Sequence, residues 1–395
     1  MYGSNKIFKT MPYILDPKNP VPTVDVARPR NLKALTSIRF FAAMHVALYH
    51  LVRPFSLWGP LKNVMGTGYI GVSFFFGLSG FILTYSHAAE YERGRGSPKK
   101  FWVARLARIY PVYLVTLIFA GYAGFALLHK QVNRIAFLAN LLLVQSWSSH
   151  MINLFHVTAW SLSVEVFFYL LFPFLLLRLR PSTAARAYFG IFVFWLLALA
   201  VPVLCVYLYP QAAWPSEIPN IPGSLLIFRI ERLPILALPE FLAGVLLGWL
   251  FLRFRPSPTI SSWLAPTGIL SLIAVLALSN HLPGVLMHNG LFIPFYSMII
   301  LGLSEENWLS HLLSAPLLVL LGEASFALYL IHFLFNDWIT GRFGASQGLG
   351  AALWKLAIVI PLSVALHLLV ERPARALILK RRSQKQAVQH LVSVS

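Results

Sequence analysis

The sequence predicts an all-α membrane protein, a polytopic bundle of about ten transmembrane helices. Hydrophobic residues make up 58% of the 395 residues, the mean hydropathy is +0.70 and only 11% of residues are charged. A soluble domain carries about 25% charged residues. The apolar residues are gathered in stretches close to the length that a bilayer requires. Spans and their connections then use nearly the whole chain, which leaves no room for a sizeable soluble domain.

We expect ten spans and one further apolar stretch that does not cross the membrane. The spans are placed at 36–52, 69–87, 109–128, 160–177, 188–209, 233–252, 263–279, 285–303, 315–338 and 351–370. If the short stretch 135–147 also crossed, the later basic loops would fall outside the cell. If it does not cross, all basic loops fall inside, as the positive-inside rule requires. We therefore expect a re-entrant or interfacial helix at 135–147 and an integral, multi-pass protein of the cell (inner or plasma) membrane with both termini cytoplasmic.

Three regions follow from this topology. Residues 1–34 are polar and basic and are expected to be a cytoplasmic, largely unstructured segment, 35–373 form the transmembrane domain, and 374–395 form a basic cytoplasmic tail. The formal net charge is +19, but the basic residues lie in short connections without any nucleic-acid-binding motif. We expect them to face the lipid bilayer and not nucleic acid. The single cysteine, Cys205, excludes an intrachain disulfide, and the absence of metal-binding motifs predicts no metal site.

The first span, TSIRFFAAMHVALYHLV, contains three ionisable residues, Arg39, His45 and His50. Positions 39 and 50 are about three helical turns apart, so both side chains lie on one face, about 16 Å apart along the axis, whereas His45 points elsewhere. Ionisable residues inside a membrane helix usually have a function. We expect Arg39 and His50 to face a shared passage in the protein interior. The alternative is that Arg39 snorkels to the interface and His50 caps the outer end of the helix.

The second span has a face of small residues. They are Gly71, Ser73, Gly77, Ser79 and Gly80. Close packing against another helix is the first explanation of such a face. The functional alternative is a slot in which a slender ligand lies against the backbone.

Two further groups of polar residues are candidates for chemistry. Arg105 and Arg108 lie three residues apart before the third span, where guanidinium groups suit phosphate or simply anchor the inner leaflet. Glu165 is expected about one turn inside the fourth span, as an orienter or proton acceptor or as half of a structural ion pair. Glu240, after Pro239, is assigned a structural role, and a lone histidine such as His332 is more often structural than catalytic.

Together these motifs resemble the acyltransferase type 3 family of membrane proteins. Six patterns occur in order over most of the chain. They are Arg39 with His50, Ser79-Gly80-Phe81, Arg105 with Arg108, Trp160-Ser161-Leu162 with Glu165, Ser325 with Tyr329-Leu330 and His332, and Glu371-Arg372-Pro373. The chain departs from the family in having Thr36 and Ser37 where many relatives have an acidic residue. Some relatives also carry a C-terminal soluble transferase domain, without which we expect this chain to act alone or with a separate partner.

The resemblance implies transfer of an acyl group, commonly acetyl from acetyl-CoA, to a sugar hydroxyl in a polysaccharide, exopolysaccharide, lipopolysaccharide or glycolipid. Acyl-CoA is then a co-substrate, and no permanently bound cofactor is expected. In this interpretation the catalytic residues are His50 as general base, Arg39 at the oxyanion or a phosphate, and Glu165 as the orienter of His50. The residues assigned to the donor are Arg105, Arg108, Ser79 and Gly80, and those assigned to substrate binding are Trp160, Ser161, Tyr329 and His332. A reaction through a covalent acyl-histidine intermediate remains an alternative.

Two other function classes remain open at this point. A proton-coupled transporter of a glycolipid or small solute would explain the ionisable residues within the spans, but not the arginine pair at the inner face. A membrane receptor or scaffold without catalytic activity is the third class. For the enzyme, the expected partners are the lipid bilayer, acyl-CoA and a carbohydrate or glycolipid acceptor, and the oligomeric state is left open.

Overall fold

The computed structural model describes residues 32–52, 57–123, 133–148, 150–152, 154–213, 223–344 and 348–380. The predicted N-terminal segment therefore lies almost entirely outside the described residues, as does most of the predicted C-terminal tail.

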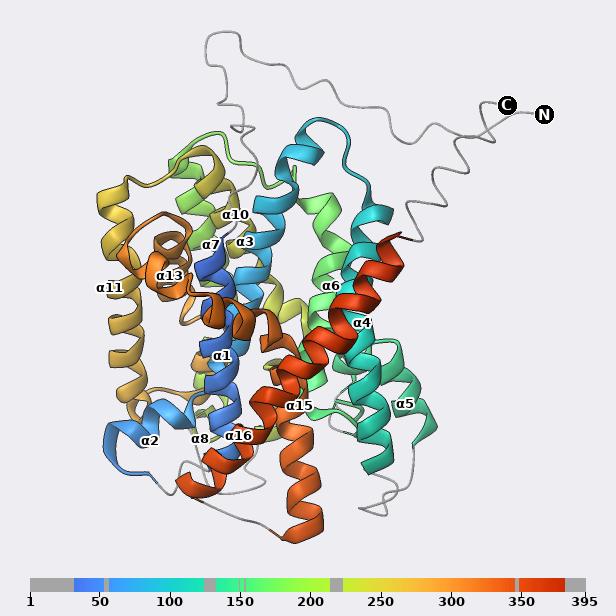
Figure 1. The fold of residues 1–395 in the computed structure, drawn as a ribbon. Helices are drawn as coiled ribbons and strands as arrows, with labels where there is room; N and C mark the ends of the chain where they lie inside the picture. The colour runs from blue at the N-terminus through green and yellow to red at the C-terminus, as the bar shows by residue number, and fades with distance from the viewer. Residues whose placement is uncertain are drawn as a thin grey trace, which may run out of the picture.

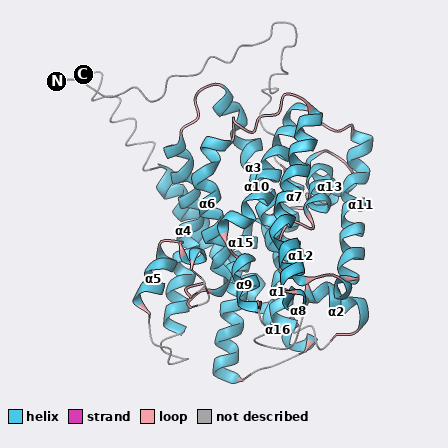
Figure 2. Cartoon of the chain, turned by 180° about the vertical axis from the view of Figure 1, so that it is seen from behind, coloured by secondary structure: helices cyan, strands magenta, loops and turns pink. Residues whose placement is uncertain are grey.

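Every regular element in the described part of the chain is helical (Figure 2). The α-helices are α1 (Lys33–Val52), α2 (Gly59–Gly66), α3 (Ile70–Glu92), α4 (Pro98–Tyr122), α5 (Arg134–Leu141), α6 (Trp160–Leu175), α7 (Ala184–Leu208), α8 (Pro210–Ala213), α9 (Ser224–Ile230), α10 (Pro234–Arg253), α11 (Pro258–Ala277), α12 (Gly284–His288), α13 (Ile293–Ser304), α14 (Trp308–Leu313), α15 (Pro316–Phe343) and α16 (Leu349–Leu366). Several begin where the sequence supplies a cap and a proline, as α4 does at Ser97 and Pro98 and α11 at Ser257 and Pro258.

Ten helical segments among the described residues are long and apolar enough to cross a bilayer, and each overlaps one of the ten predicted spans. Most correspond to one long helix. The eighth combines α12 and α13, and the tenth runs from Leu349 to Lys380 through a π-helical turn at His367–Glu371. The predicted all-α polytopic bundle is confirmed. The helix continues past the predicted boundary at residue 373, because nothing in 374–380 breaks it.

The chain passes up and down the bundle, so its connections gather at two ends (Figure 1). We call the end at which α1 and α4 begin the basic end; it lies at the top of Figure 1 and includes Lys99, Lys100, Arg105, Arg108, Arg180 and Arg253. Arg180 forms a 3.0 Å ion pair there with Glu92, which ties the connection between α6 and α7 to the end of α3. The other end, which we call the opposite end, includes Val52, Tyr69, Trp160, Arg232 and His288.

The stretch 135–147 is too short to cross, as predicted. It folds into the eight-residue α5 and a 3₁₀ turn at Gln145–Trp147. Tyr110 and Tyr113 of α4 donate hydrogen bonds to the carbonyls of Leu141 and Asn140 at the end of α5, with distances of 2.6 and 2.7 Å. The segment therefore packs against one side of α4 near the edge of the bundle (Figure 1).

The small residues of α3 serve close helix packing. A Cβ on Gly80 would lie 2.2 Å from the carbonyl oxygen of Phe241, and a Cβ on Gly244 would lie 2.0 Å from that of Gly77. The backbones of α3 and α10 thus touch where both helices lack side chains. At Gly80 the α10 backbone already occupies the space that a ligand slot would need, whereas a Cβ on Gly77 would meet only the Glu240 carbonyl, at 3.8 Å.

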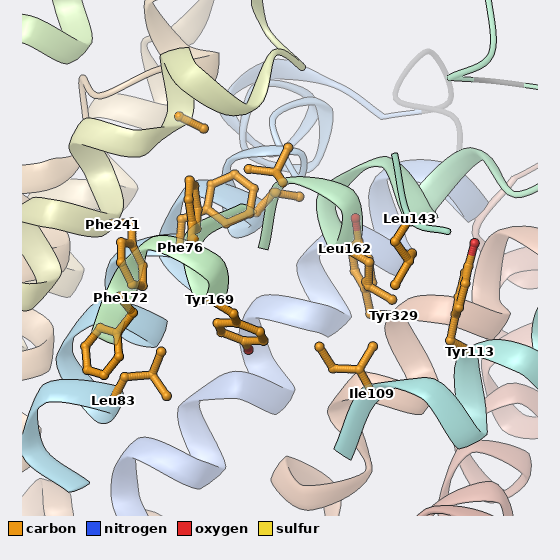
Figure 3. Packing of buried hydrophobic residues seen from close by; sticks show 14 of the residues in the cluster. Phe76, Leu83, Ile109, Tyr113, Leu143, Leu162, Tyr169, Phe172, Phe241 and Tyr329 are labelled. Atoms are coloured by element: carbon orange, nitrogen blue, oxygen red, sulfur yellow. The ribbon is translucent and has the colours of Figure 1, made fainter. Parts of the chain in front are cut away.

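The helices at the edge of the bundle turn apolar side chains outward. Phe189 of α7 and Leu270 of α11 are each 68% exposed, as expected of side chains that face lipid. The interior holds a cluster of buried aromatic and aliphatic residues around α3, α4, α6 and α10 (Figure 3). In it the rings of Phe168 and Phe241 stack with centroids 4.7 Å apart. This cluster forms the rigid frame around the polar residues described next.

Candidate functional site

A cavity of about 220 Å³ lies between α1, α3, α4, α6 and α15. Seven of the eleven site residues predicted from the sequence line it: Arg39, Ser79, Arg105, Arg108, Ser161, Glu165 and Tyr329. The other four, which are His50, Gly80, Trp160 and His332, are not part of its lining. Because five separate helices contribute, the cavity exists only in the folded bundle.

The end of the cavity nearest the basic end carries three arginines, Arg39, Arg105 and Arg108. Within the described part of the chain, none of the three makes a hydrogen bond or an ion pair, and the Nε atom of Arg105 is buried without a partner. Arg39 and Arg108 are close enough to repel each other. Three unpaired cations in a partly buried cavity are unfavourable by themselves, so this arrangement is suited to holding an anion.

Glu165 faces the same cavity. Its Oε1 atom accepts hydrogen bonds from the Ser79 hydroxyl, at 3.2 Å, and from the Tyr169 hydroxyl one helical turn away. The expectation that Glu165 orients His50 is not met, because its hydrogen bonds go to α3 and to its own helix. With three arginines and one carboxylate, the formal charge of the cavity lining is +2 (three positive charges minus one negative).

Two hydroxyl groups form the far end of the cavity. The Ser161 and Tyr329 hydroxyls share a hydrogen bond of 2.8 Å, and Tyr329 also donates to the Thr158 carbonyl at 2.9 Å. These contacts join the start of α6 to the middle of α15. They fix the Tyr329 side chain, which lies near Leu162 of α6 in Figure 3.

His50 lies one layer beyond Tyr329, next to His332. The Nδ1 atom of His50 is 3.0 Å from the Nε2 atom of His332, and the ring centroids of His332 and Tyr329 are 6.0 Å apart. Arg39 therefore lines the predicted interior passage, but His50 does not reach it. Tyr329 lines the cavity and its ring lies beside His332, the partner of His50, and only the tertiary packing of α15 against α1 reveals this arrangement. His45 points elsewhere, as predicted, with its Nε2 atom 2.7 Å from the Val64 carbonyl.

The opposite end holds an ion-pair cluster that sequence reasoning missed. The Nη1 atom of Arg232 lies 3.2 Å from Glu231, whose other oxygen is 3.7 Å from His288. The Arg232 guanidinium stacks 3.8 Å from the centre of the Phe228 ring and 5.5 Å from that of Trp160. Burial raises the pKa of Glu231 to about 7, and Arg232 opposes part of this rise. The available signal was two adjacent charged residues just before an apolar span.

This cluster is continuous with the histidine pair through aromatic contacts. His288 stacks on Tyr69 with ring centroids 3.8 Å apart, Tyr69 contacts Tyr49, and Tyr49 contacts His50 at 4.8 Å. Arg232 is within electrostatic range of His50. The opposite end therefore presents one connected group of histidine, tyrosine and arginine side chains.

Two other ionisable groups serve the fold. Glu240 accepts a 2.6 Å hydrogen bond from the backbone N–H of Gly290 and so ties α10 to the segment before α13, which agrees with its expected structural role. His367 in the π-helical turn lies 3.0 Å from Glu371 and 3.4 Å from Glu323 of α15. It connects the last span to α15 near the basic end.

Known proteins resemble this chain over most of its length. The chain is 31% identical over 385 residues to the acyltransferase MdmB of Streptomyces mycarofaciens, covering 89% of this chain and 93% of that protein. It is 26% identical over 326 residues to a putative O-acetyltransferase of Staphylococcus aureus strain COL, and 27% identical over 337 residues to the O-acetyltransferase OatA of S. aureus strain NCTC 8325 / PS 47. Each alignment covers 77% of this chain and 50% of the staphylococcal protein, so the match spans only half the length of those relatives. No solved structure gives a significant match.

Residues 32–372 match the family defined by an acyltransferase domain. This region contains the first span, the three arginines, the cavity and the histidine pair. The chain therefore belongs to the acyltransferase type 3 family and is a membrane acyltransferase.

Proposed function

We propose that this enzyme transfers an acetyl group from acetyl-CoA to a hydroxyl group of a carbohydrate or glycolipid acceptor. The observation that carries the proposal is the cavity, which joins three unpaired arginines near the basic end to a pair of hydroxyl groups beside His50 and His332. The relatives named as O-acetyltransferases support the acetyl group and the hydroxyl acceptor.

The basic end suits the donor. Coenzyme A carries several phosphate charges, and planar guanidinium groups bind phosphate with paired hydrogen bonds. The cavity, at about 220 Å³, is smaller than the roughly 300–1,000 Å³ typical of ligand pockets. It would therefore admit the narrow pantetheine arm with its thioester, while the nucleotide stays among Arg105 and Arg108. By the positive-inside rule the basic end is cytoplasmic, which is where coenzyme A is made.

Arg39 belongs with the donor phosphates in this proposal. It lies in the same cavity as Arg108 and about 16 Å from His50 along α1, from the helical rise of eleven residues. A group at that distance cannot contact the carbonyl that reacts beside His50. The Ser161 and Tyr329 hydroxyls lie at the other end of the cavity, and to stabilise charge on the thioester oxygen one of them would turn its proton away from the Thr158 carbonyl.

His50 is the proposed general base, because the unprotonated nitrogen of a neutral imidazole can accept the proton of a hydroxyl group. It takes the proton from the acceptor hydroxyl while the acceptor oxygen attacks the acetyl carbonyl carbon. A C–O bond forms, the C–S bond breaks, and the departing thiolate takes the proton from His50. Coenzyme A leaves as the thiol, and no net proton is released.

The opposite end suits the acceptor, which would approach from the outer side of the membrane. Arg232 offers N–H donors there, and the Trp160 ring lies beside its guanidinium. The Nη2 atom of Arg232 has no hydrogen-bond partner among the described residues. A sugar with several hydroxyl oxygens offers the acceptors that such a donor requires.

The test uses the purified protein in lipid nanodiscs with radiolabelled acetyl-CoA. Acetyl-CoA is expected to raise the apparent Tm, since a ligand that binds only the folded state stabilises it by about 2.7 kcal/mol at 100 times its Kd. No stabilisation by millimolar acetyl-CoA would overturn the donor assignment and favour a transporter. Mass spectrometry of surface glycans from cells with and without the protein then identifies the acetylated acceptor. If cells without the protein carry the same acetyl groups as cells with it, the proposal of a glycan acceptor is wrong.

A further inference from the structure

We infer that His332 is a positioning residue that holds His50 in the tautomer needed for catalysis. The inference begins with the two contacts of His332. Its Nδ1 atom lies 3.1 Å from the carbonyl oxygen of Leu328, one turn earlier in α15, and its Nε2 atom lies 3.0 Å from Nδ1 of His50. His332 is completely buried, so water does not compete for either nitrogen.

These contacts determine where the protons lie. A carbonyl oxygen only accepts, so Nδ1 of His332 must carry a proton. A neutral imidazole carries one proton, and its other nitrogen is an acceptor. Nε2 of His332 therefore accepts, and Nδ1 of His50 must donate. This leaves Nε2 of His50 unprotonated, with its lone pair available to a hydroxyl proton.

The opposite assignment is disfavoured by burial. If Nε2 of His50 carried the proton, its Nδ1 atom would be an acceptor and would require a proton on Nε2 of His332. His332 would then carry two protons and a full positive charge inside a buried site, where an unpaired charge is unfavourable. No carboxylate among the described residues forms an ion pair with His332.

Packing fixes the ring orientation as well as the tautomer. Tyr49 and Phe333 contact the His50 ring edge-on, with centroids 4.8 and 5.2 Å away. The centroids of the two imidazole rings are 5.1 Å apart. When His50 takes a proton from the acceptor, its Nδ1–H bond to His332 becomes charge-assisted and therefore stronger. A histidine backed by a carbonyl here performs the orienting role that the sequence suggested for Glu165.

The inference rests on the proposed function, so its test includes a readout that does not depend on activity. Two-bond ¹H–¹⁵N spectra of the histidine-labelled protein distinguish the two tautomers, and His50→Gln identifies the His50 signal. We expect the wild-type protein to show a protonated Nδ1 and an unprotonated Nε2 at His50. In His332→Leu, which cannot accept, only the interaction of His50 with the Val46 backbone remains, so we expect this preference to weaken. A protonated Nε2 in the wild type would overturn the inference whatever the activity.

Activity provides the second readout. His332→Leu should lower kcat about 10²- to 10⁴-fold, the range for losing an oriented general base, with KM for acetyl-CoA changed less than twofold. His332→Gln retains a carbonyl oxygen that can accept a hydrogen bond from His50. Its kcat should be at least tenfold higher than that of His332→Leu. The matched control is His45→Gln. His45 lies on α1 with His50 but bonds to the Val64 carbonyl, so this variant should keep wild-type kcat.

Wild-type kcat in His332→Leu, or no recovery in a folded His332→Gln, would contradict the inference. If no acetyl transfer is found even in the wild type, the proposed function fails, while the tautomer measurement still decides the role of His332.

Discussion

The basic end and the opposite end of this bundle both contain partly buried arginines, but these arginines differ in their partners. Arg39, Arg105 and Arg108 line a cavity and have no hydrogen-bond or ion-pair partner among the described residues. Arg232 is paired with Glu231 and stacked on two aromatic rings.

A buried cation without a partner lowers stability, whereas one that is already paired supports the fold. The comparison therefore separates a region prepared for an anionic ligand from a region that is largely complete without one. Four predictions test this difference, from the largest expected effect to the smallest.

Replacing His50 should give the largest effect. We expect His50→Ala to lower kcat for acetyl transfer by about 10³-fold or more, because the proposed general base is lost. The radiolabel assay in nanodiscs measures this. The stabilisation by acetyl-CoA should persist, since the donor arginines are intact. A variant that transfers acetyl at near the wild-type rate would remove His50 from catalysis.

The paired replacement Arg105→Ala with Arg108→Ala should raise KM for acetyl-CoA about 10- to 100-fold. This corresponds to about 1.4–2.7 kcal/mol for the two residues together. It is less than the sum of two charge-assisted hydrogen bonds of roughly 1.5–3 kcal/mol each, because both guanidinium groups are partly exposed. Initial rates at varied acetyl-CoA provide the measurement. Arg178→Ala is the matched control, because Arg178 lies near the basic end but is exposed, and among the described residues it bonds only to the Phe174 carbonyl. An unchanged KM for acetyl-CoA in the double variant would show that the basic end does not bind the donor.

The two kinds of arginine should respond to methionine with opposite signs. Without ligand, Arg39→Met is expected to raise the free energy of unfolding by about 1 kcal/mol, because it removes an unpaired cation. Arg232→Met is expected to lower it by about 1–3 kcal/mol, because Glu231 stays buried without its partner. Thermal unfolding in detergent compares the two. If both variants lose stability equally, Arg39 has a structural partner and the distinction between the ends is wrong.

The smallest effect concerns pH. Burial raises the pKa of Glu231 to about 7, so this group favours the folded state fully below its ordinary value of about 4.5 and loses that contribution as pH rises towards 7. In Arg232→Met the pKa of Glu231 should rise further. The free energy of unfolding of this variant should therefore keep falling as the pH rises above 7. The stability gap between wild type and variant should therefore widen by up to about 1 kcal/mol between pH 6 and pH 8.5. In a Glu231→Gln background, the gap should not change with pH.

Much of the site was predictable from local sequence. Helix periodicity placed Arg39 on an inward face and His45 on another, and both placements are confirmed. The position of Glu165 one turn inside α6 also led correctly to the interior. These predictions worked because the relative direction of side chains along one helix depends only on the helical repeat.

The pairing of residues from different helices was not predictable in the same way. His50 and His332 are 282 positions apart, and neither residue's helix indicates which neighbour it will meet. The assignment of His50 to Glu165 failed because the number of turns along α1 says nothing about how α6 and α15 pack against it. The glycines of α3 gave a correct signal for close packing, but only the structure shows that α10 is the partner.

The sequence by itself determined the number of spans, the short non-crossing helix and the set of polar residues inside the bundle. These depend on the free energy of placing each residue in hydrocarbon, which is a property of composition and length. Tertiary structure alone decided that Tyr329 lines the cavity while His50 does not, and that His332 and not Glu165 contacts His50. It also decided that, among the described residues, Arg232 has an ion-pair partner and Arg39 has none. Those features depend on which helices touch, and in a bilayer that choice is made by backbone packing and hydrogen bonds between helices.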